Sequence, residues 1–132
     1  VLAHDGTPGL QVRSSTGTWI DVPAVDGTFV VNLGDMLERM TGGRYLSTPH
    51  RVRHGGGTRD RLSFPFFFDP GWDAEILPVP DAALTGPVRE VDRWDDASVH
   101  TWSGTYGDYL TAKVAKVFPA LTDHLAPEPP PA

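Results

Sequence analysis

Glycine and proline interrupt this chain so often that they limit its possible folds more than any other feature. The 132 residues include 14 glycines and 13 prolines, and the apolar–polar alternations between them are short. Frequent turn and helix-breaking residues favour a turn-rich β structure over a helical bundle. The length suits one domain with its own core. Four Trp, three Tyr and six Phe argue against a disordered chain.

The first half of the chain predicts a hairpin, a buried strand and a short helix. Leu10–Arg13 alternates apolar and polar residues, and Thr18–Val22 returns as a second strand after a turn. Thr28–Leu33 is rich in β-branched residues and should form a buried strand. Met36–Met40 predicts one or two helical turns, which a pair of glycines ends.

The second half predicts short strands followed by one late helix. The expected strands are Pro49–Arg53, Arg59–Asp69 and Glu75–Val79. Pro65 indicates an edge strand or a bulge. Tyr106–Phe118 places its apolar residues on one helical face, and Pro119 should end that helix. Many short strands with a late helix favour a sandwich or a jelly roll.

Charge and composition exclude several function classes. Eleven basic against seventeen acidic residues give a net charge of −6, which argues against sequence-independent nucleic-acid binding. No apolar run has the length of a membrane span, and no signal peptide is apparent. The chain has no cysteine, which excludes disulfides and permits a reducing compartment. We therefore expect a cytoplasmic protein.

Arginine is unevenly distributed along the chain. Nine of the eleven cations are arginine, and six of these fall between Arg39 and Arg61. A solvated rim or a salt-bridge network is one interpretation, because arginine is mostly a surface residue. A local anion site is the other.

His50 differs from the other histidines in its setting. His4, His100 and His124 lie in polar or terminal contexts and are interpreted as surface residues. Strand alternation places His50 and Val52 on one face, which should point toward a core or a cavity. The residues alone allow either a satisfied buried histidine or a ligand.

Arg61 and Ser63 should also share one strand face. An arginine that faces inward must meet an anion, because an unpaired buried guanidinium is too costly. Its planar fork suits a carboxylate, and the serine hydroxyl can donate a further hydrogen bond. An internal Asp or Glu partner is the alternative.

A series of segments, in order along the chain, resembles one known family. They are Gly6–Val12, Trp19–Pro23, Asn32–Arg39, Tyr45–Val52, Arg61–Ser63, Phe66–Pro70 and Tyr106–Leu110. Together they look like the isopenicillin N synthase-like family of iron(II)/2-oxoglutarate-dependent oxygenases.

The resemblance implies a mainly β fold, the double-stranded β-helix, a jelly roll of cupin-like type. It would be incomplete at the N-terminus, because the opening Val1-Leu2-Ala3 run looks like the middle of a strand. A missing N-terminal segment is then expected to complete the barrel. Residues 1–103 would be the C-terminal portion of the barrel, 104–125 a helix packing on it, and 126–132 a disordered proline-rich tail.

The resemblance also implies an enzyme with a specific site. Family members bind iron(II) through a His-x-Asp pair and a distal histidine, a two-histidine-one-carboxylate arrangement. His50 matches that distal histidine, and Arg61 and Ser63 match the residues that hold 2-oxoglutarate. The intact dioxygenase would use O2 and 2-oxoglutarate to oxidise a small molecule, releasing succinate. Phe66 and Phe68 could line the substrate pocket, although core packing is the competing role.

The chain departs from the family pattern at the metal. It contains no His-x-Asp, and His4 and Asp5 are adjacent, so that on a strand they would face opposite ways. A truncated, non-catalytic relative that binds a carboxylate ligand or a partner chain is therefore the alternative, and open strand edges could also pair two copies. Some family members use no 2-oxoglutarate, and the Arg-x-Ser motif can hold another substrate's carboxylate.

Overall fold

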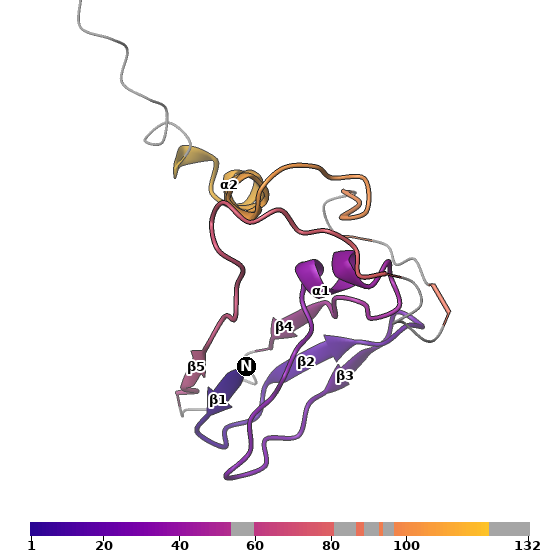
Figure 1. The fold of residues 1–132 in the computed structure, drawn as a ribbon. Coiled ribbons are helices and arrows are strands. Elements are labelled where there is room, and N and C mark those ends of the chain that lie inside the picture. Colours follow the sequence, from indigo (N-terminus) through magenta and orange to yellow (C-terminus); the bar gives the residue numbers. More distant parts are fainter. Residues whose placement is uncertain (54–59, 81–86, 89–92, 94–96, 122–132) are drawn as a thin grey trace, which may run out of the picture. The chain divides into compact units, whose positions relative to one another are not determined.

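A computed structural model describes residues 1–53, 60–80, 87–88, 93 and 97–121 of the protein. The chain divides into two compact units. Unit 1 comprises Val1–Asp69 with Leu77–His100, and unit 2 comprises Pro70–Ile76 with the residues from Thr101 onward. In chain order the elements are β1 (Leu2–His4), β2 (Leu10–Arg13), β3 (Trp19–Asp21), α1 (Asp35–Met40), β4 (His50–Val52), β5 (Ser63–Pro65) and α2 (Tyr106–Val117) (Figure 1).

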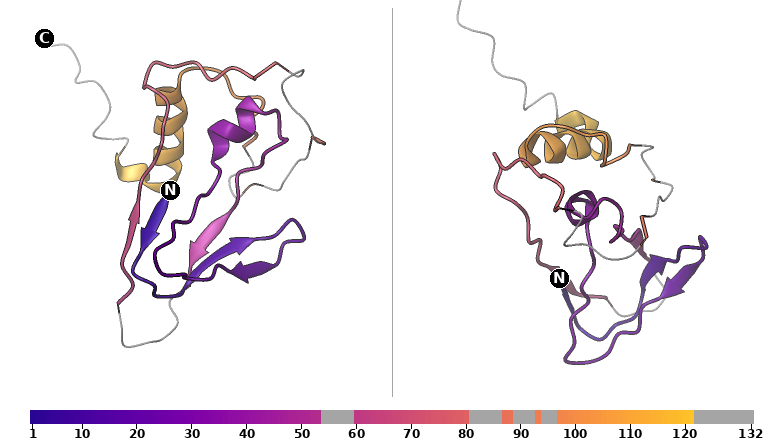
Figure 2. Two further views of the ribbon diagram at one scale, coloured as in Figure 1. Left: turned by 60° about the horizontal axis from the view of Figure 1, so that its bottom comes forward. Right: turned by 45° about the vertical axis from the view of Figure 1, so that its right-hand side comes forward.

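Unit 1 contains a three-stranded antiparallel sheet with β2 between β3 and β4 (Figures 1 and 2). The central residue Gln11 is 4% exposed and faces a partner on each side. Its amide nitrogen donates to the Asp21 carboxylate at 2.8 Å, and its oxygen accepts from the Arg51 guanidinium at 2.9 Å. Arg51 also lies 4.1 Å from the centre of the Trp19 ring. The pairing of β2 with β3 confirms the predicted hairpin. The contacts of Arg51 hold β4 against the other edge of β2.

A second, two-stranded antiparallel sheet pairs β1 with β5. Beyond its end, the Asp5 N–H donates to the Leu62 carbonyl at 3.2 Å, and the Leu62 N–H donates to the Asp5 carboxylate at 2.9 Å. On the other side of β1, Leu2 and Val30 exchange two backbone hydrogen bonds of 2.8 and 3.0 Å. The strand β1 is therefore hydrogen-bonded on both sides.

Three predicted strands are shorter in the structure. Thr28–Leu33 contributes only the bridge at Val30, and its Phe29 and Val31 side chains are 67% and 68% exposed. In the described part of Arg59–Asp69 only β5 is a strand, and Glu75–Val79 contributes a bridge between Glu75 and Thr105. A strand extends only as far as its backbone groups find partners. Around β5 such partners run from Leu62, which accepts from Asp5, to Phe66, which bonds Val1.

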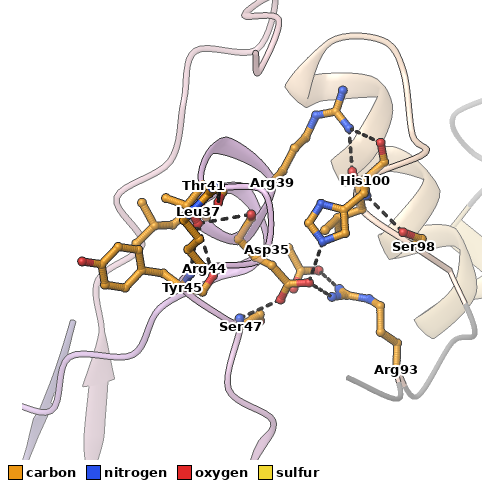
Figure 3. A network of polar contacts seen from close by, with 12 residues as sticks. Asp35, Leu37, Arg39, Thr41, Arg44, Tyr45, Ser47, Arg93, Ser98 and His100 are labelled. Carbon is orange, nitrogen blue, oxygen red and sulfur yellow. Dashed lines mark hydrogen bonds and ion pairs between the residues drawn. The ribbon is translucent and has the colours of Figure 1, made fainter. Parts of the chain in front are cut away.

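Helix α1 carries a buried carboxylate that organises unit 1. Glu38 is 3% exposed, and its Oε2 accepts a 2.7 Å hydrogen bond from the Ser47 N–H. Its Oε1 lies 3.3 Å from Arg93 Nη1 and 3.5 Å from His100 Nε2. Figure 3 shows Ser47, Arg93 and His100 gathered beside the helix, where Arg93 also pairs with Asp35. The short helix predicted at Met36–Met40 is thus confirmed and anchored by an ionic network.

Unit 2 is built around α2. Thr105 and Asp108 form a capping box at its N-terminus, each side chain accepting the other residue's backbone N–H. Gly107 lies against Trp72, whose ring would be 2.4 Å from an added Cβ, and its N–H donates to the Trp72 carbonyl. The helix matches the predicted Tyr106–Phe118 to within one residue. No described helix combines the length and apolar character needed to cross a membrane.

We predict that Glu38→Ala lowers the free energy of unfolding by about 3 kcal/mol. It removes one carboxylate that pairs with the largely buried Arg93, and it removes the acceptor of the Ser47 N–H. Chemical denaturation of the complete gene product measures this change. The exposed Glu75 provides the matched control, and Glu75→Ala should alter stability by less than about 0.5 kcal/mol. Equal effects of both substitutions would contradict the anchoring role.

We predict that the contribution of the Asp5 carboxylate to the free energy of unfolding is lost at acidic pH. Hydrogen bonds from the Leu62 and Thr7 N–H groups lower its pKa from the ordinary 3.8 to about 2. A lowered folded-state pKa stabilises the fold fully above the unfolded pKa and progressively less as the pH falls to the folded one. The difference in unfolding free energy between wild type and Asp5→Asn should therefore shrink as the pH falls from about 4 to about 2. A difference that does not change with pH would contradict this.

Candidate functional site

His50 begins β4 and pairs in register with Val12 of β2. Its Nδ1 lies 3.1 Å from the Thr48 carbonyl oxygen, and a carbonyl can only accept, so Nδ1 carries the proton. The Nε2 lone pair is then available to a metal, which is the arrangement that metal-binding histidines commonly use. The predicted inward orientation was wrong for this chain: His50 is exposed and Val52 is 60% exposed.

Hydrogen bonds from distant segments hold the residues that lead into His50. The Pro49 carbonyl accepts from the Arg13 N–H at 2.9 Å. The Thr48 N–H donates to the Leu33 carbonyl at 3.4 Å, and Ser47 is held by Glu38. The approach to His50 is therefore fixed by β2, by the segment before α1, and by α1 itself.

Arg61 and Ser63 interact directly, as their spacing predicted. Arg61 Nη1 donates to Ser63 Oγ at 3.1 Å, and both residues are partly buried. Arg61 Nε is buried and meets no acceptor among the described residues. The alternative of an internal carboxylate partner is also not met within the described part of the chain. Within the described residues, the guanidinium therefore has a buried donor, Nε, without an acceptor, and a second donor, Nη1, bonded to a serine hydroxyl.

Two residues near β1 and β2 position Arg61. Asp5 bonds Leu62, the residue between Arg61 and Ser63, through both its backbone and its carboxylate. Gly9 has φ +133°, and a Cβ there would lie 2.9 Å from the Arg53 carbonyl and 3.6 Å from Arg61 Cδ. The bare glycine thus permits the close approach of Arg53, the residue that follows β4, with the Arg61 stem alongside.

Arg61 borders a small hollow that is partly open to solvent. Apolar side chains form much of its lining: Leu10, Val22, Pro23, Ala24 and Val30. His4 also lines it and was wrongly interpreted as a surface residue, since its Nε2 is buried and meets no described partner. Local sequence offered no signal for this, because the position of His4 depends on the pairing of β1 with β5, distant in sequence.

The structure does not bring the two predicted pocket phenylalanines into a core. Phe66 and Phe68 follow the end of β5 and are 63% and 91% exposed. Neither borders the hollow beside Arg61. Their roles in a substrate pocket stay predictions, whereas core packing is not observed in this chain.

The described arginines between Arg39 and Arg61 make different kinds of contact and do not gather at one point. Arg39 donates to the Val99 and His100 carbonyls, Arg44 to the Thr41 carbonyl, and Arg51 to Gln11. These contacts are structural. Among the arginines of this stretch that the structure describes, Arg61 is the one that lines the hollow.

His50, the predicted metal ligand, has its Nε2 lone pair available. The described residues nevertheless contain no group of three or more His, Cys, Asp or Glu side chains able to hold a metal ion. His4 and Asp5 do not substitute for the family's metal pair. Asp5 already accepts from Leu62 and Thr7, and His4 Nδ1 accepts from Gly6. The described residues therefore offer one candidate metal ligand, His50, and one arginine, Arg61, whose chemistry suits a carboxylate.

Comparison with known proteins identifies relatives along most of the chain. A probable iron/ascorbate oxidoreductase of Dictyostelium discoideum is 45% identical over 126 residues, 95% of this chain and 34% of the relative. A 1-aminocyclopropane-1-carboxylate oxidase of Dictyostelium mucoroides is 44% identical over 122 residues, 90% of this chain and 33% of the relative. Feruloyl CoA ortho-hydroxylase 1 of Arabidopsis thaliana is 40% identical over 120 residues, with 89% and 33% covered. The chain thus spans about a third of the length of these curated relatives.

A solved structure is also similar. Neurospora crassa T7H, crystallised at full length with alpha-KG and 5-formyluracil, superposes with a TM-score of 0.66 at 29% identity. The match covers 87% of this chain and 35% of that protein. Residues 1–70, more than half of the 132, match the family described as the 2OG-Fe(II) oxygenase superfamily. The chain therefore belongs to the 2OG-Fe(II) oxygenase superfamily.

Proposed function

We propose that this chain is the part of an iron(II)/2-oxoglutarate-dependent oxygenase that supplies the distal iron ligand, His50, and the cosubstrate-binding pair, Arg61 and Ser63. The intact enzyme would oxidise a small molecule. The observation that carries the proposal is the partly buried Arg61 guanidinium, which bonds Ser63, borders a small hollow and meets no carboxylate among the described residues. Such a group favours a carboxylate ligand.

The comparisons support both halves of this proposal. The family is defined by iron(II) and 2-oxoglutarate, and the similar Neurospora crassa structure contains alpha-KG, which is 2-oxoglutarate. The relatives named above act on different molecules according to their names, so they do not indicate one substrate for this protein.

Each residue has a defined task in the proposed site. When bound, iron and 2-oxoglutarate supply the oxidation, in which O2 is consumed and 2-oxoglutarate becomes succinate and CO2. His50 would offer Nε2 to the metal, held in orientation by its Nδ1–H bond to Thr48. Arg61 and Ser63 would hold the distal carboxylate and so orient the cosubstrate. The apolar lining beside Arg61 would strengthen that ionic contact by excluding water.

We predict that His50→Ala reduces succinate release by the complete gene product at least about 100-fold, the usual scale for loss of a metal-site partner. The assay follows succinate released with Fe(II), 2-oxoglutarate and candidate small-molecule substrates. Val52→Ala is the control, because it alters an exposed side chain on the same face of β4 and should retain most activity. Unchanged turnover in His50→Ala would refute the assignment of the ligand.

Arg61 should determine affinity for the cosubstrate. Arg61→Lys keeps the charge but loses the planar fork, so the Kd for 2-oxoglutarate should rise at least about tenfold, while Arg61→Ala should abolish measurable binding. Calorimetric titration with and without Fe(II) measures both. Arg13→Lys, at an exposed arginine of β2, serves as the control. Binding that requires Arg61 but no metal, without succinate release, would instead indicate a non-catalytic carboxylate-binding protein.

A further inference from the structure

The sheet of β1 and β5 has one face toward the hollow beside Arg61 and one face away from it. His4, which lines the hollow, lies directly opposite Ser63 on the neighbouring strand (Figure 1). The next residues along the two strands, Ala3 and Phe64, also form a direct pair. Because adjacent residues of a strand point to opposite faces, Ala3 and Phe64 belong to the face that is turned away from the hollow.

This second face continues along both strands and onto the segment beside β1. Val1 and Phe66 exchange backbone hydrogen bonds of 2.8 and 2.7 Å, which extends the pairing of β1 with β5 by one residue. On the other edge of β1, the bridging residue Val30 lines the hollow. Its neighbours Phe29 and Val31 therefore project to the face away from the hollow.

The face away from the hollow, which we call the apolar back face, is open in the described part of the chain. Its large side chains have exposed fractions from 48% to 68% and are those of Val1, Phe29, Val31, Leu62, Phe64 and Phe66. A contiguous apolar surface of this kind marks a place where another element packs. A sheet with apolar side chains on both faces is typical of the middle layer of a domain, which is covered on both sides.

The length of the relatives indicates what covers the apolar back face. The chain spans about a third of each curated relative named above, so a protein of their length has about two thirds of its residues outside these 132. A segment tethered to the sheet has an effective concentration on the order of millimolar, which favours it over a second copy of the protein.

We propose that the apolar back face is a docking surface for the part of the complete gene product that lies outside residues 1–132. That part packs an apolar surface of its own against the face. The contact differs from strand pairing at the sheet edges, because it buries side chains and needs no backbone hydrogen bonds. It replaces the pocket role considered for Phe66, which lies on this face beside Val1. The contact involves neither iron nor cosubstrate, so it is independent of the function proposed above.

Photochemical cross-linking of the complete gene product identifies what covers the face. One variant carries Phe64→p-benzoylphenylalanine, which keeps an aromatic side chain in the middle of the face. The control carries the same residue at Ser15, which is exposed in the turn between β2 and β3. After irradiation and digestion, mass spectrometry should join position 64 to a peptide from outside residues 1–132, in a product of monomer mass. Position 15 should give little product.

Hydroxyl-radical footprinting of the unmodified gene product tests the same contact without a substitution. A covered side chain reacts only when the contact opens, so Phe29 and Phe64 should be oxidised at least about tenfold more slowly in the native protein than in the denatured one. Native rates within about twofold of the denatured rates would mean that the face stays open, which would overturn the inference.

Two cross-linking results would also overturn it. A product of twice the monomer mass that disappears on dilution would assign the face to a second copy. Cross-links from position 64 that are confined to residues 1–132 would mean that this chain covers its own face. Failure of the protein to bind 2-oxoglutarate would contradict the proposed function and leave the docking surface unaffected.

Discussion

The close approach of three segments at Gly9 is the constraint on which the candidate site depends. The Gly9 carbonyl accepts from the Arg53 N–H at 2.8 Å and so continues the pairing of β2 with β4. With a backbone φ of +133° and a Cβ position 2.9 Å from the Arg53 carbonyl, a larger residue would be strained there. The Arg61 stem lies next to this point, 3.6 Å from the Cβ position. One glycine therefore permits the close pairing with Arg53 at the end of the His50 strand, beside Arg61.

Carboxylates and donors have separate roles around this point. The carboxylates of Glu38 and Asp5 find hydrogen-bond donors within the protein. Each accepts from a backbone N–H that lies close in sequence to a candidate site residue. Glu38 holds Ser47, three residues before His50, and Asp5 holds Leu62, between Arg61 and Ser63. His4 Nε2 and Arg61 Nε are instead buried and meet no acceptor among the described residues. The two acids thus stabilise the backbone on either side of the candidate site.

Sequence patterns predicted those elements that depend on local interactions. The hairpin of β2 and β3, the short α1 and the long α2 all followed from alternation, helical periodicity and turn residues. The buried strand predicted at Thr28–Leu33 differs from the structure, where the segment forms one bridge at Val30 and leaves Phe29 and Val31 exposed. Burial is a property of neighbouring segments, and a pattern within one segment does not contain it.

Sequence alone was enough to identify the family and three candidate site residues. His50, Arg61 and Ser63 stand in motifs that follow one another in the order of the family. Sequence did not establish that any of the three binds a ligand. The tertiary structure was needed to show that His4 lines the same hollow as Arg61 and that Asp5 and Glu38 hold backbone N–H groups. The partners of His4 and Asp5 lie 57 or more residues away in sequence, across the β1–β5 pairing. Such contacts arise when distant strands adopt one register, so short-range residue spacing does not reveal them.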